Sequence, residues 1–436
     1  MRNLVKEMES LFINHDDFFI EKELVDKTEI SLIGFRTLVD LTRSKLYLQQ
    51  IAVSSPSVIA LFKNLSDQIN VDKEKIIESV LEGKLVLISE NGEWNTIVDP
   101  IFQNLNRGIE EPKNESPIQA SVDAFGDDIN INVGMIRKRL STEHLCHCSY
   151  QVGKLEKRKL SMLYIKGSAP DALVDRVNQQ LRQINSDIET IDDLNNHFGK
   201  RKLSPVSHLF STELPIQAIH SLKKNRIVLF IDNCPFALVF PHLLWDMFSS
   251  VNDRNFTFSL SIMLRVFRII GAVSTLILPA LYVALVSVNP EVFKTDLALF
   301  VIKSREGIPL SAFLETITMV VLVDLILEAI VRLPKSVGPA ITMVGGIILG
   351  QAMVEAKLVS NLLVIVITAV VIASSAVIGM QNSLYIRLLK YPILILASIF
   401  GILGVCIGLI FTIIYLASLT SNDIPYTTFR IDEKET

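Results

Sequence analysis

One apolar run that contains three acids constrains this chain more than any other stretch. The run Ile308–Ile330 begins with a helix-start signal, Pro309 just after Gly307. A helix of ~23 residues at ~1.5 Å per residue crosses the ~30 Å hydrocarbon core of a bilayer. An ionisable side chain at that depth is costly unless it meets protein, water or a partner charge. We therefore expect this helix to pack among other helices or to border water on at least one side.

The acids of this run fall on two faces of the expected helix. At ~100° per residue, Glu315 shares one face with Ser311 and Thr318. Asp324 and Glu328 share roughly the opposite face. The first face is a polar stripe that is typical of a water-facing lining, and the second favours a lock between helices.

A structural alternative is that these acids only pair with basic neighbours. Arg332 and Lys335 follow the end of the run, and Glu328 lies nearest to them, where it can reach the membrane interface. Glu315 and Asp324 lie closer to the helix centre, where an ionisable residue favours a functional role.

The chain divides sharply into a charged part and an apolar part. It is ordinary in charge up to about Val251 and almost continuously apolar from Phe256 to Leu419. The first 30 residues lack the apolar core of a signal peptide, so we expect the charged part to stay in the cytoplasm. A net charge of −4 and the lack of a basic, aromatic-interleaved stripe argue against nucleic-acid binding.

The cysteines do not predict a disulfide framework or a metal site. Strand alternation would place His144, Cys146 and Cys148 of the HLCHC run on one face, but no fourth ligand pattern completes a zinc site. The remaining cysteines, Cys234 and Cys406, lie far away in sequence, the latter inside an expected span. We expect no metal and no cofactor.

The charged part contains a weak internal duplication. The strand-like run Leu85–Ile88 is followed by a turn at Asn91-Gly92, and Ile227–Phe230 begins a similar pattern later in the chain. Earlier in each copy lie the matching runs Ile30–Ile33 and Leu160–Leu163. Neither copy contains a Walker loop, a GxGxxG or a GxSxG motif, so we do not expect an enzyme.

The expected fold is an α/β region of two related subdomains followed by an all-α polytopic membrane domain of about five, possibly six, helices. The expected boundaries are 1–105 for the first cytoplasmic subdomain, 106–120 for a linker, 121–255 for the second subdomain, 256–268 for an interfacial amphipathic helix, 269–419 for the transmembrane domain and 420–436 for a C-terminal tail. The expected spans are Ile269–Val288, Ile308–Ile330, Val337–Ala356, Leu358–Gly379 and Pro392–Ala417. Leu297–Ile302 is apolar but too short to cross, which leaves the count open.

Basic and small residues predict orientation and packing. The Lys/Arg bias places four interface anchors, Arg265, Arg268, Arg332 and Lys335, on the cytoplasmic side. Two GxxxG pairs, Gly346 with Gly350 and Gly404 with Gly408, predict close helix contacts. The third expected span adds a polar pair, Gln351 and Glu355, one turn apart. The candidates for a pore or for coupling are therefore Glu315, Asp324, Glu328, Ser311, Thr318, Gln351 and Glu355.

Short motifs in both parts of the chain point to a known family. In the charged part they are Asn132, Ile136–Leu140, Ser204-Pro205, Thr212-Glu213, Pro215, Asp232, Pro235-Phe236 and Pro241. In the apolar part they are Leu278–Leu285, Pro290-Glu291, Thr295-Asp296, Ser304–Gly307, Pro309, Glu315, Arg332–Pro334, Gly338, Gly345, Gly350–Ala352, Glu355-Ala356, Leu358–Ser360 and Pro425-Tyr426. By their number and order, the run from about Ala120 to Phe429 resembles the A subunit of GerA-type nutrient germinant receptors of spore-forming bacteria.

Three departures from the family pattern indicate a diverged copy. Ser121–Ala124 stands where Gly-Pro-Arg is usual, Leu214 where an arginine is usual, and Val320 where an acid is usual.

The resemblance implies a multi-pass subunit of the spore inner membrane. It implies two partners, a transporter-like B subunit that holds the nutrient pocket and a C-subunit lipoprotein. It also implies a homo-oligomeric ring with a central cation path that nutrient binding opens. Two alternatives stay open from the residues alone: a non-conducting scaffold that couples the B subunit to downstream proteins, and a secondary transporter, although the expected spans show no inverted repeat.

Overall fold

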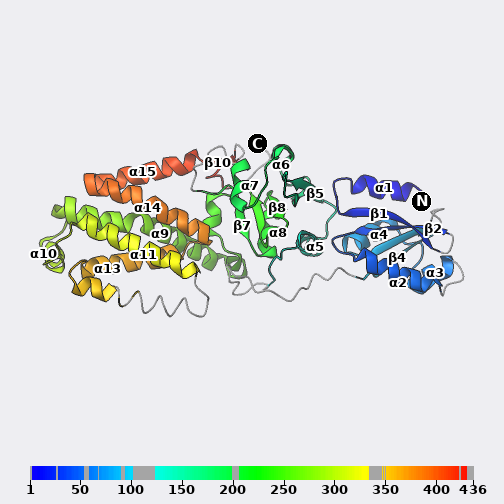
Figure 1. Cartoon of the computed structure of the whole chain (residues 1–436), viewed down its shortest axis with the longest axis horizontal. Coiled ribbons are helices and arrows are strands. Elements are labelled where there is room, and N and C mark those ends of the chain that lie inside the picture. Colours follow the sequence, from blue (N-terminus) through cyan, green and yellow to red (C-terminus); the bar gives the residue numbers. More distant parts are fainter. Residues whose placement is uncertain are drawn as a thin grey trace. The chain divides into compact units, whose positions relative to one another are not determined.

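The computed structural model describes residues 2–25, 28–53, 58–66, 68–89, 94–101, 123–198, 206–332, 346, 348, 350–421 and 424–429 (Figure 1). The chain forms two compact units. The first contains Met1–Leu243 with Thr420–Ile424 and Thr428–Thr436, and the second contains Leu244–Leu419 with Pro425–Thr427. The expected linker at 106–120 lies outside the described residues.

The first sheet contains four antiparallel strands in the order β1-β2-β3-β4. The strands are β1 (Phe18–Val25), β2 (Thr28–Phe35), β3 (Leu85–Ser89) and β4 (Asn95–Val98). The helices around it are α1 (Arg2–Leu11), α2 (Leu41–Val53), α3 (Val58–Leu65) and α4 (Lys73–Leu81). All five residues of β3 are buried, and its continuous apolar run is typical of a strand without a solvent face.

The second sheet has the order β5-β6-β8-β9-β7, again antiparallel. Its strands are β5 (Leu145–Val152), β6 (Arg158–Ile165), β7 (Phe210–Thr212), β8 (Ile227–Ile231) and β9 (Ala237–Phe240), with helices α5 (Ile129–Arg139), α6 (Asp171–Gln183), α7 (Ile191–Phe198) and α8 (Pro215–Lys223). Side chains of β8 alternate between two cores: Leu229 belongs to one, and Val228 and Phe230 belong to the other. Helices therefore cover both faces of this sheet.

The expected duplication agrees with the strand pairing. The strands β2-β3-β4 and β6-β8-β9 have the same antiparallel order, and a helix precedes β3 and β8 in each copy. The strand-like runs of the sequence all lie in strands. The expected turn at Asn91-Gly92 lies outside the described residues.

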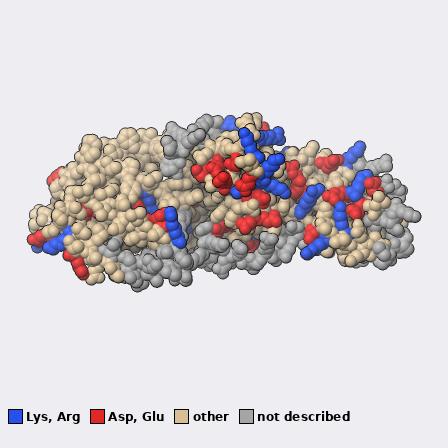
Figure 2. Space-filling view, viewed as in Figure 1, with Lys and Arg blue, Asp and Glu red and all other residues tan. Residues whose placement is uncertain are grey.

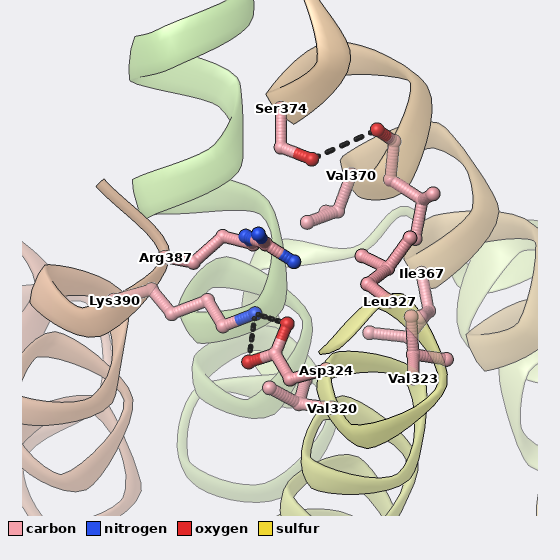
Figure 3. A pocket seen from close by; sticks show the side chains of 10 residues that line it. Val320, Val323, Asp324, Leu327, Ile367, Val370, Ser374, Arg387 and Lys390 are labelled. Atoms are coloured by element: carbon pink, nitrogen blue, oxygen red, sulfur yellow. Dashed lines mark hydrogen bonds and ion pairs between the residues drawn. The ribbon is translucent and has the colours of Figure 1, made fainter. Parts of the chain in front are cut away.

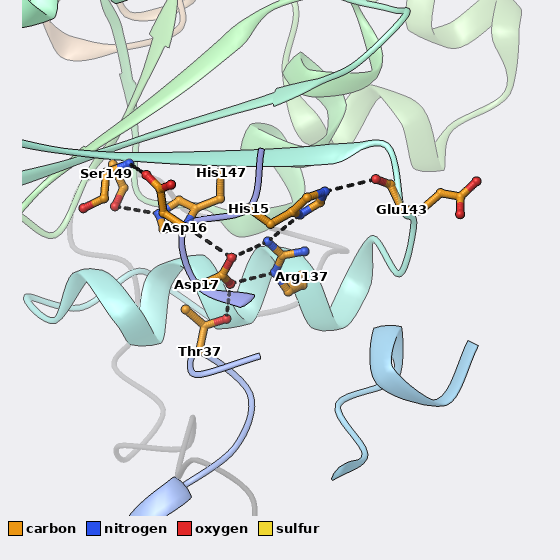
Figure 4. A network of polar contacts seen from close by, with 9 residues as sticks. His15, Asp16, Asp17, Thr37, Arg137, Glu143, His147 and Ser149 are labelled. Carbon is orange, nitrogen blue, oxygen red and sulfur yellow. Dashed lines mark hydrogen bonds and ion pairs between the residues drawn. The ribbon is translucent and has the colours of Figure 1, made fainter. Parts of the chain in front are cut away.

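A buried polar network joins the two sheets within the first unit (Figure 4). Arg137 of α5, with no exposed surface, donates to both carboxylate oxygens of Asp17, at 2.9 Å and 2.7 Å. Thr37 donates to the same carboxylate at 2.7 Å, and Nδ1 of His147 lies 3.3 Å from it. His15 completes the network through a contact of 3.4 Å between its Nδ1 and Arg137. An arginine paired in this way satisfies two buried charges at once.

The second unit is helical. Its elements are the 3-10 helices η1 (Leu244–Phe248), η2 (Val251–Asn255) and η4 (Pro290–Val292), a π-helical turn η3 (Ala284–Val288), and the α-helices α9 (Phe258–Val283), α10 (Thr295–Ser304), α11 (Ala312–Arg332), α13 (Asn361–Ser375), α14 (Met380–Phe400) and α15 (Ile402–Ser418). After α15 come the short strands β10 (Thr420–Ser421), which belongs to the first unit, and β11 (Ile424–Pro425), which lies at the boundary of the two units in sequence. On the face drawn in Figure 2, charged side chains gather over the α/β part, and the helices are largely free of them.

Two helices in the described part are long and apolar enough to cross a membrane, Phe258–Val288 and Gln381–Phe400. Asn361–Ser375 and Ile402–Ser418 are apolar but shorter. A membrane domain is therefore supported by two helices, and the count of five spans stays a prediction.

Two expected helix boundaries are wrong. The expected interfacial helix at 256–268 and the first span are one continuous helix, α9. The expected fifth span, Pro392–Ala417, is broken at Gly401, where φ is +62° and the chain turns from α14 into α15. The turn needs glycine because a Cβ there would overlap the Asn289 side chain, whose Oδ1 accepts from the Ile402 amide at 3.0 Å.

Candidate functional site: buried charges of the helical unit

Glu315 is completely buried near the start of α11. Its Oε2 lies 3.3 Å from Nε of Arg305, and its Oε1 accepts from the backbone amide of Ser360 at 2.6 Å. Ser360 is the N-cap of α13, and its hydroxyl also contacts the hydroxyl of Tyr282 from α9 at 2.9 Å. One carboxylate therefore connects α11 to the start of α13, and through Ser360 to α9.

The polar stripe expected around Glu315 does not share one environment. Ser311 and Thr318 are exposed in the single chain, whereas Glu315 is not. Glu315 thus does not face water within one chain, and a water-facing lining in an assembled receptor stays a prediction. Arg305 satisfies the charge instead, because it comes from the short connection between α10 and α11.

Asp324, whose side chain is 21% exposed, forms the second pair, about two and a half turns further along α11. Lys390 of α14 places its Nζ 3.0 Å from Oδ1 and 2.9 Å from Oδ2 of Asp324, and the hydroxyl of Tyr391 donates to Oδ2 at 2.6 Å. Lys390 is only 4% exposed. The sequence pointed to Arg332 or Lys335 as the basic partner; Arg332 does not fill this role, and Lys335 lies outside the described residues.

A small, partly open recess lies beside the Asp324–Lys390 pair (Figure 3). Its lining is apolar apart from this pair, Arg387 and Ser374. Nε of Arg387 is buried and has no hydrogen-bond partner in the described part of the chain. The recess thus holds two cations and one carboxylate, which gives it a net positive charge.

The remaining polar candidates form exposed pairs within single helices. Glu328 accepts from Arg332 at 2.7 Å, with 45% and 77% of the two side chains exposed. Gln351 donates to Glu355 at 2.9 Å on an exposed surface. Both pairs lie on exposed surface and not in the helix packing. Exposed pairs of this kind add little to stability in water.

The two glycine pairs differ in their surroundings. A Cβ on Gly404 would overlap the backbone carbonyl of Leu396, and one on Gly408 would lie 3.1 Å from Cα of Ile393. Both glycines thus lie where α15 packs closely against α14. A Cβ on Gly346 or Gly350 would meet no atom within 4 Å in the described part of the chain.

The anchors Arg265 and Arg268 lie on α9 beside Asp253. The partners Arg305, Lys390 and Tyr391 were missed by the sequence reading of the acids. The sequence signal was weak, because Pro392 follows Lys390 closely, although α14 continues through this proline. Starting the last span at Pro392 excluded Lys390 and Tyr391.

Comparisons with known proteins place these residues in context. The profile of the family described as "Bacillus/Clostridium GerA spore germination protein" matches residues 6–435. The chain is 33% identical to spore germination protein GerLA of Bacillus cereus over 81% of its length and 72% of that protein. It is 30% identical to spore germination protein A1 of Bacillus subtilis (81% and 73% covered) and 32% identical to the uncharacterized membrane protein YfkQ of the same species (82% and 71% covered).

Among solved structures, the N-terminal domain of the A subunit of the Bacillus megaterium spore germinant receptor GerK3 aligns with a TM-score of 0.42 and 17% identity. The alignment covers 55% of this chain and 94% of that domain.

Proposed function

This chain belongs to the GerA family of Bacillus and Clostridium spore germination proteins, and we propose from this premise that it is the A-type subunit of a nutrient germinant receptor. The match of the family profile across residues 6–435 carries the proposal, because it includes both units. We place the subunit in the spore inner membrane as a multi-pass protein with its α/β region in the cytoplasm. Its partners are a nutrient-binding B-type subunit, a C-type lipoprotein and further copies of itself.

The role that we assign to the buried charges is coupling between helices. Glu315 connects α11 to α13, and Asp324 connects α11 to α14. Each connection is charged and sits among apolar side chains, so breaking it costs several kcal/mol unless a new partner is supplied. Helix α11 is thus suited to switch between discrete arrangements rather than to bend gradually.

In the proposed mechanism, nutrient binding to the B-type subunit shifts α11, and the rearranged oligomer conducts cations. Within one chain the three acids of α11, Glu315, Asp324 and Glu328, are all paired, so a cation path along this helix needs either a rearrangement of these pairs or side chains from several copies. The same observation favours a second candidate, a non-conducting scaffold in which α11 only transmits the signal. A secondary transporter is disfavoured because the duplication that the described residues show lies in the α/β region.

Deletion of the gene in its host tests the receptor role. Spores that lack it should lose or slow their response to at least one nutrient in a panel of amino acids and sugars, measured by cation release and loss of refractility. Unchanged responses across the whole panel would remove the receptor assignment for this copy.

Flux through the assembled receptor separates the channel from the scaffold. The parent and Glu315→Gln would be co-expressed with the B-type and C-type partners, reconstituted in vesicles and exposed to the active nutrient. We expect nutrient-dependent cation flux in the parent and reduced flux in Glu315→Gln with assembly retained. A well-assembled parent without flux would favour the scaffold.

A further inference from the structure

Arg387 of α14 is a cation without a counter-charge in the described part of the chain. Its Nε is buried and forms no hydrogen bond with any described residue. Asp324, the acid that lines the same recess, already bonds to Lys390 and Tyr391. The guanidinium of Arg387 is therefore left as a second positive charge beside a pair that is neutral by itself.

The described walls of this recess do not neutralise the extra charge. They come from α11, α13 and α14, and in Figure 3 the side chains of Arg387 and Lys390 point into the space between these helices. Apart from the charged residues, the polar side chain of the lining is Ser374, whose hydroxyl already donates to the Val371 carbonyl at 2.8 Å. The other lining residues are apolar: Val320, Val323, Leu327, Ile367, Val370 and Val371.

Charge and size together define what the recess can hold. Its two cations and one carboxylate leave one positive charge in excess, and a charge in apolar surroundings is costly without compensation. The free space has room for about one water-sized atom. A water molecule fits by size but leaves the charge in place, whereas a carboxylate or phosphate group has several heavy atoms and is too large. A monatomic anion satisfies both conditions.

We propose that the recess binds one chloride ion, with the guanidinium of Arg387 and the ammonium group of Lys390 as its donors. The ammonium group has three N–H donors and Asp324 supplies two acceptor oxygens, so one donor remains for the ion. Hydrogen bonds from charged donors to an anion are stronger than those from neutral donors. Because the lining residues come from three helices, a bound chloride stabilises the packing of α11, α13 and α14. The site goes beyond the proposed receptor function and does not depend on it.

Thermal unfolding of the full chain in detergent tests the site. Sodium chloride would replace sodium gluconate stepwise at constant ionic strength, because gluconate is too large for the recess. An ion that binds only the folded protein raises Tm by mass action. At about four times its Kd, chloride should raise the Tm of the parent by about 2–4 °C relative to gluconate.

Two variants locate the effect. Arg387→Gln removes the unpaired cation and keeps the Asp324–Lys390 pair, so the variant should fold and its Tm should be the same in both salts. Arg332→Gln is the matched control, since it removes an exposed cation at the end of α11, and it should keep the chloride effect of the parent. The line width of the chloride NMR signal gives a second readout on the folded proteins, and it should be broader with the parent than with Arg387→Gln.

Each outcome of this experiment decides the proposal. A chloride-dependent rise in Tm that is lost in Arg387→Gln and kept in Arg332→Gln supports it. Equal Tm values of the parent in chloride and gluconate overturn it, and water or a side chain of another subunit would then fill the recess. The same rise in Arg387→Gln as in the parent also overturns it, because chloride would then act elsewhere. A loss of the effect in both variants would indicate general surface charge and overturn it as well.

Discussion

The carboxylate of Asp324 in α11 and the ammonium group of Lys390 in α14 face each other, with Nζ 3.0 Å and 2.9 Å from the two oxygens (Figure 3). Tyr391 donates a third bond to the same carboxylate. The pair joins two helices through residues that lie 66 positions apart in the sequence. The pairing with Asp324 also explains how Lys390 can be buried in the middle of α14.

Removing one partner of this pair should destabilise the protein more than removing both. Lys390→Met leaves the carboxylate with Tyr391 alone, so we expect a loss on the order of 2–4 kcal/mol, and a similar loss for Asp324→Leu. The double variant replaces both charges by apolar side chains and should regain much of that loss. Thermal unfolding of the detergent-solubilised proteins gives the coupling energy.

The exposed pair of the same helix provides the control for this cycle. Glu328→Gln should change stability by only about 0.5 kcal/mol, because its partner Arg332 is largely exposed. Losses that simply add in the Asp324 and Lys390 variants would mean that the two charges do not interact.

Much of the fold could be predicted from the sequence, since local patterns determine it. Buried strands such as β3 and β8 appear as short apolar runs, and the two copies repeat the same order. The helix boundaries were harder, because an apolar run has no internal signal for a turn. Gly401 divides α14 from α15 because its backbone has a positive φ. The close approach of the Asn289 side chain, which shows why glycine is needed there, is visible only in the structure.

The sequence predicted the acids of the site but not their partners. The acids of α11 stand out, because a carboxylate in an apolar run is costly. Their partners come from elsewhere in the chain: Arg305 from a connection and Lys390 from another helix. Helical periodicity relates residues within one helix and carries no information on which helix packs next to it. The stripe of Ser311, Glu315 and Thr318 therefore predicted a water-facing surface, whereas in the single chain Arg305 packs against Glu315.

The glycine pairs should respond in opposite ways to larger side chains. Gly404→Leu should reduce the stability of the single chain by several kcal/mol, because its side chain would enter the backbone of α14 near Leu396. Gly346→Leu should leave that stability unchanged. Thermal unfolding tests both.

Size-exclusion chromatography with light scattering adds the oligomeric state. If Gly346 lies between copies, Gly346→Leu should weaken the oligomer while the subunit stays folded. Normal assembly of this variant would remove Gly346 from the contacts between helices.

The network around Arg137 should make the first subdomain sensitive to acid (Figure 4). Burial, and then the charge of Arg137, lower the pKa of His15 to about 4 from 6.5. Between these values the unfolded chain binds more protons, so the free energy of unfolding should fall as the pH drops from about 6.5 to about 4, by as much as ~3 kcal/mol. Burial alone would raise the pKa of Asp17, but Arg137 and His147 outweigh it and hold that pKa well below its usual range, so further acid acts in the same direction.

Replacing the titrating ring isolates this effect. His15→Phe keeps a ring beside Phe12 and Phe35 and should flatten the loss of stability between pH 6.5 and 4. His144→Phe, on an exposed histidine nearby, should not. The chain has two tryptophans, so Trp94 fluorescence in a Trp245→Phe background reports the unfolding of this subdomain in the whole chain. An unchanged pH profile in His15→Phe would assign the acid sensitivity to other groups.

Glu315 and Arg305 should contribute unequally to the free energy of unfolding. Arg305→Gln leaves a fully buried carboxylate without its counter-charge, whereas Glu315→Gln leaves a cation whose side chain is 21% exposed and an amide oxygen that can still accept from Ser360. Arg305→Gln should therefore be the more destabilising, by roughly 1–3 kcal/mol, and adding Glu315→Gln to it should restore stability rather than reduce it further. Thermal unfolding of both single variants and the double variant measures this order. If Glu315 faces an aqueous path in the assembled receptor, water replaces the arginine, and Arg305→Gln would instead be nearly neutral there. The same variants measured as single subunits and as oligomers thus distinguish a coupling carboxylate from one that lines a path.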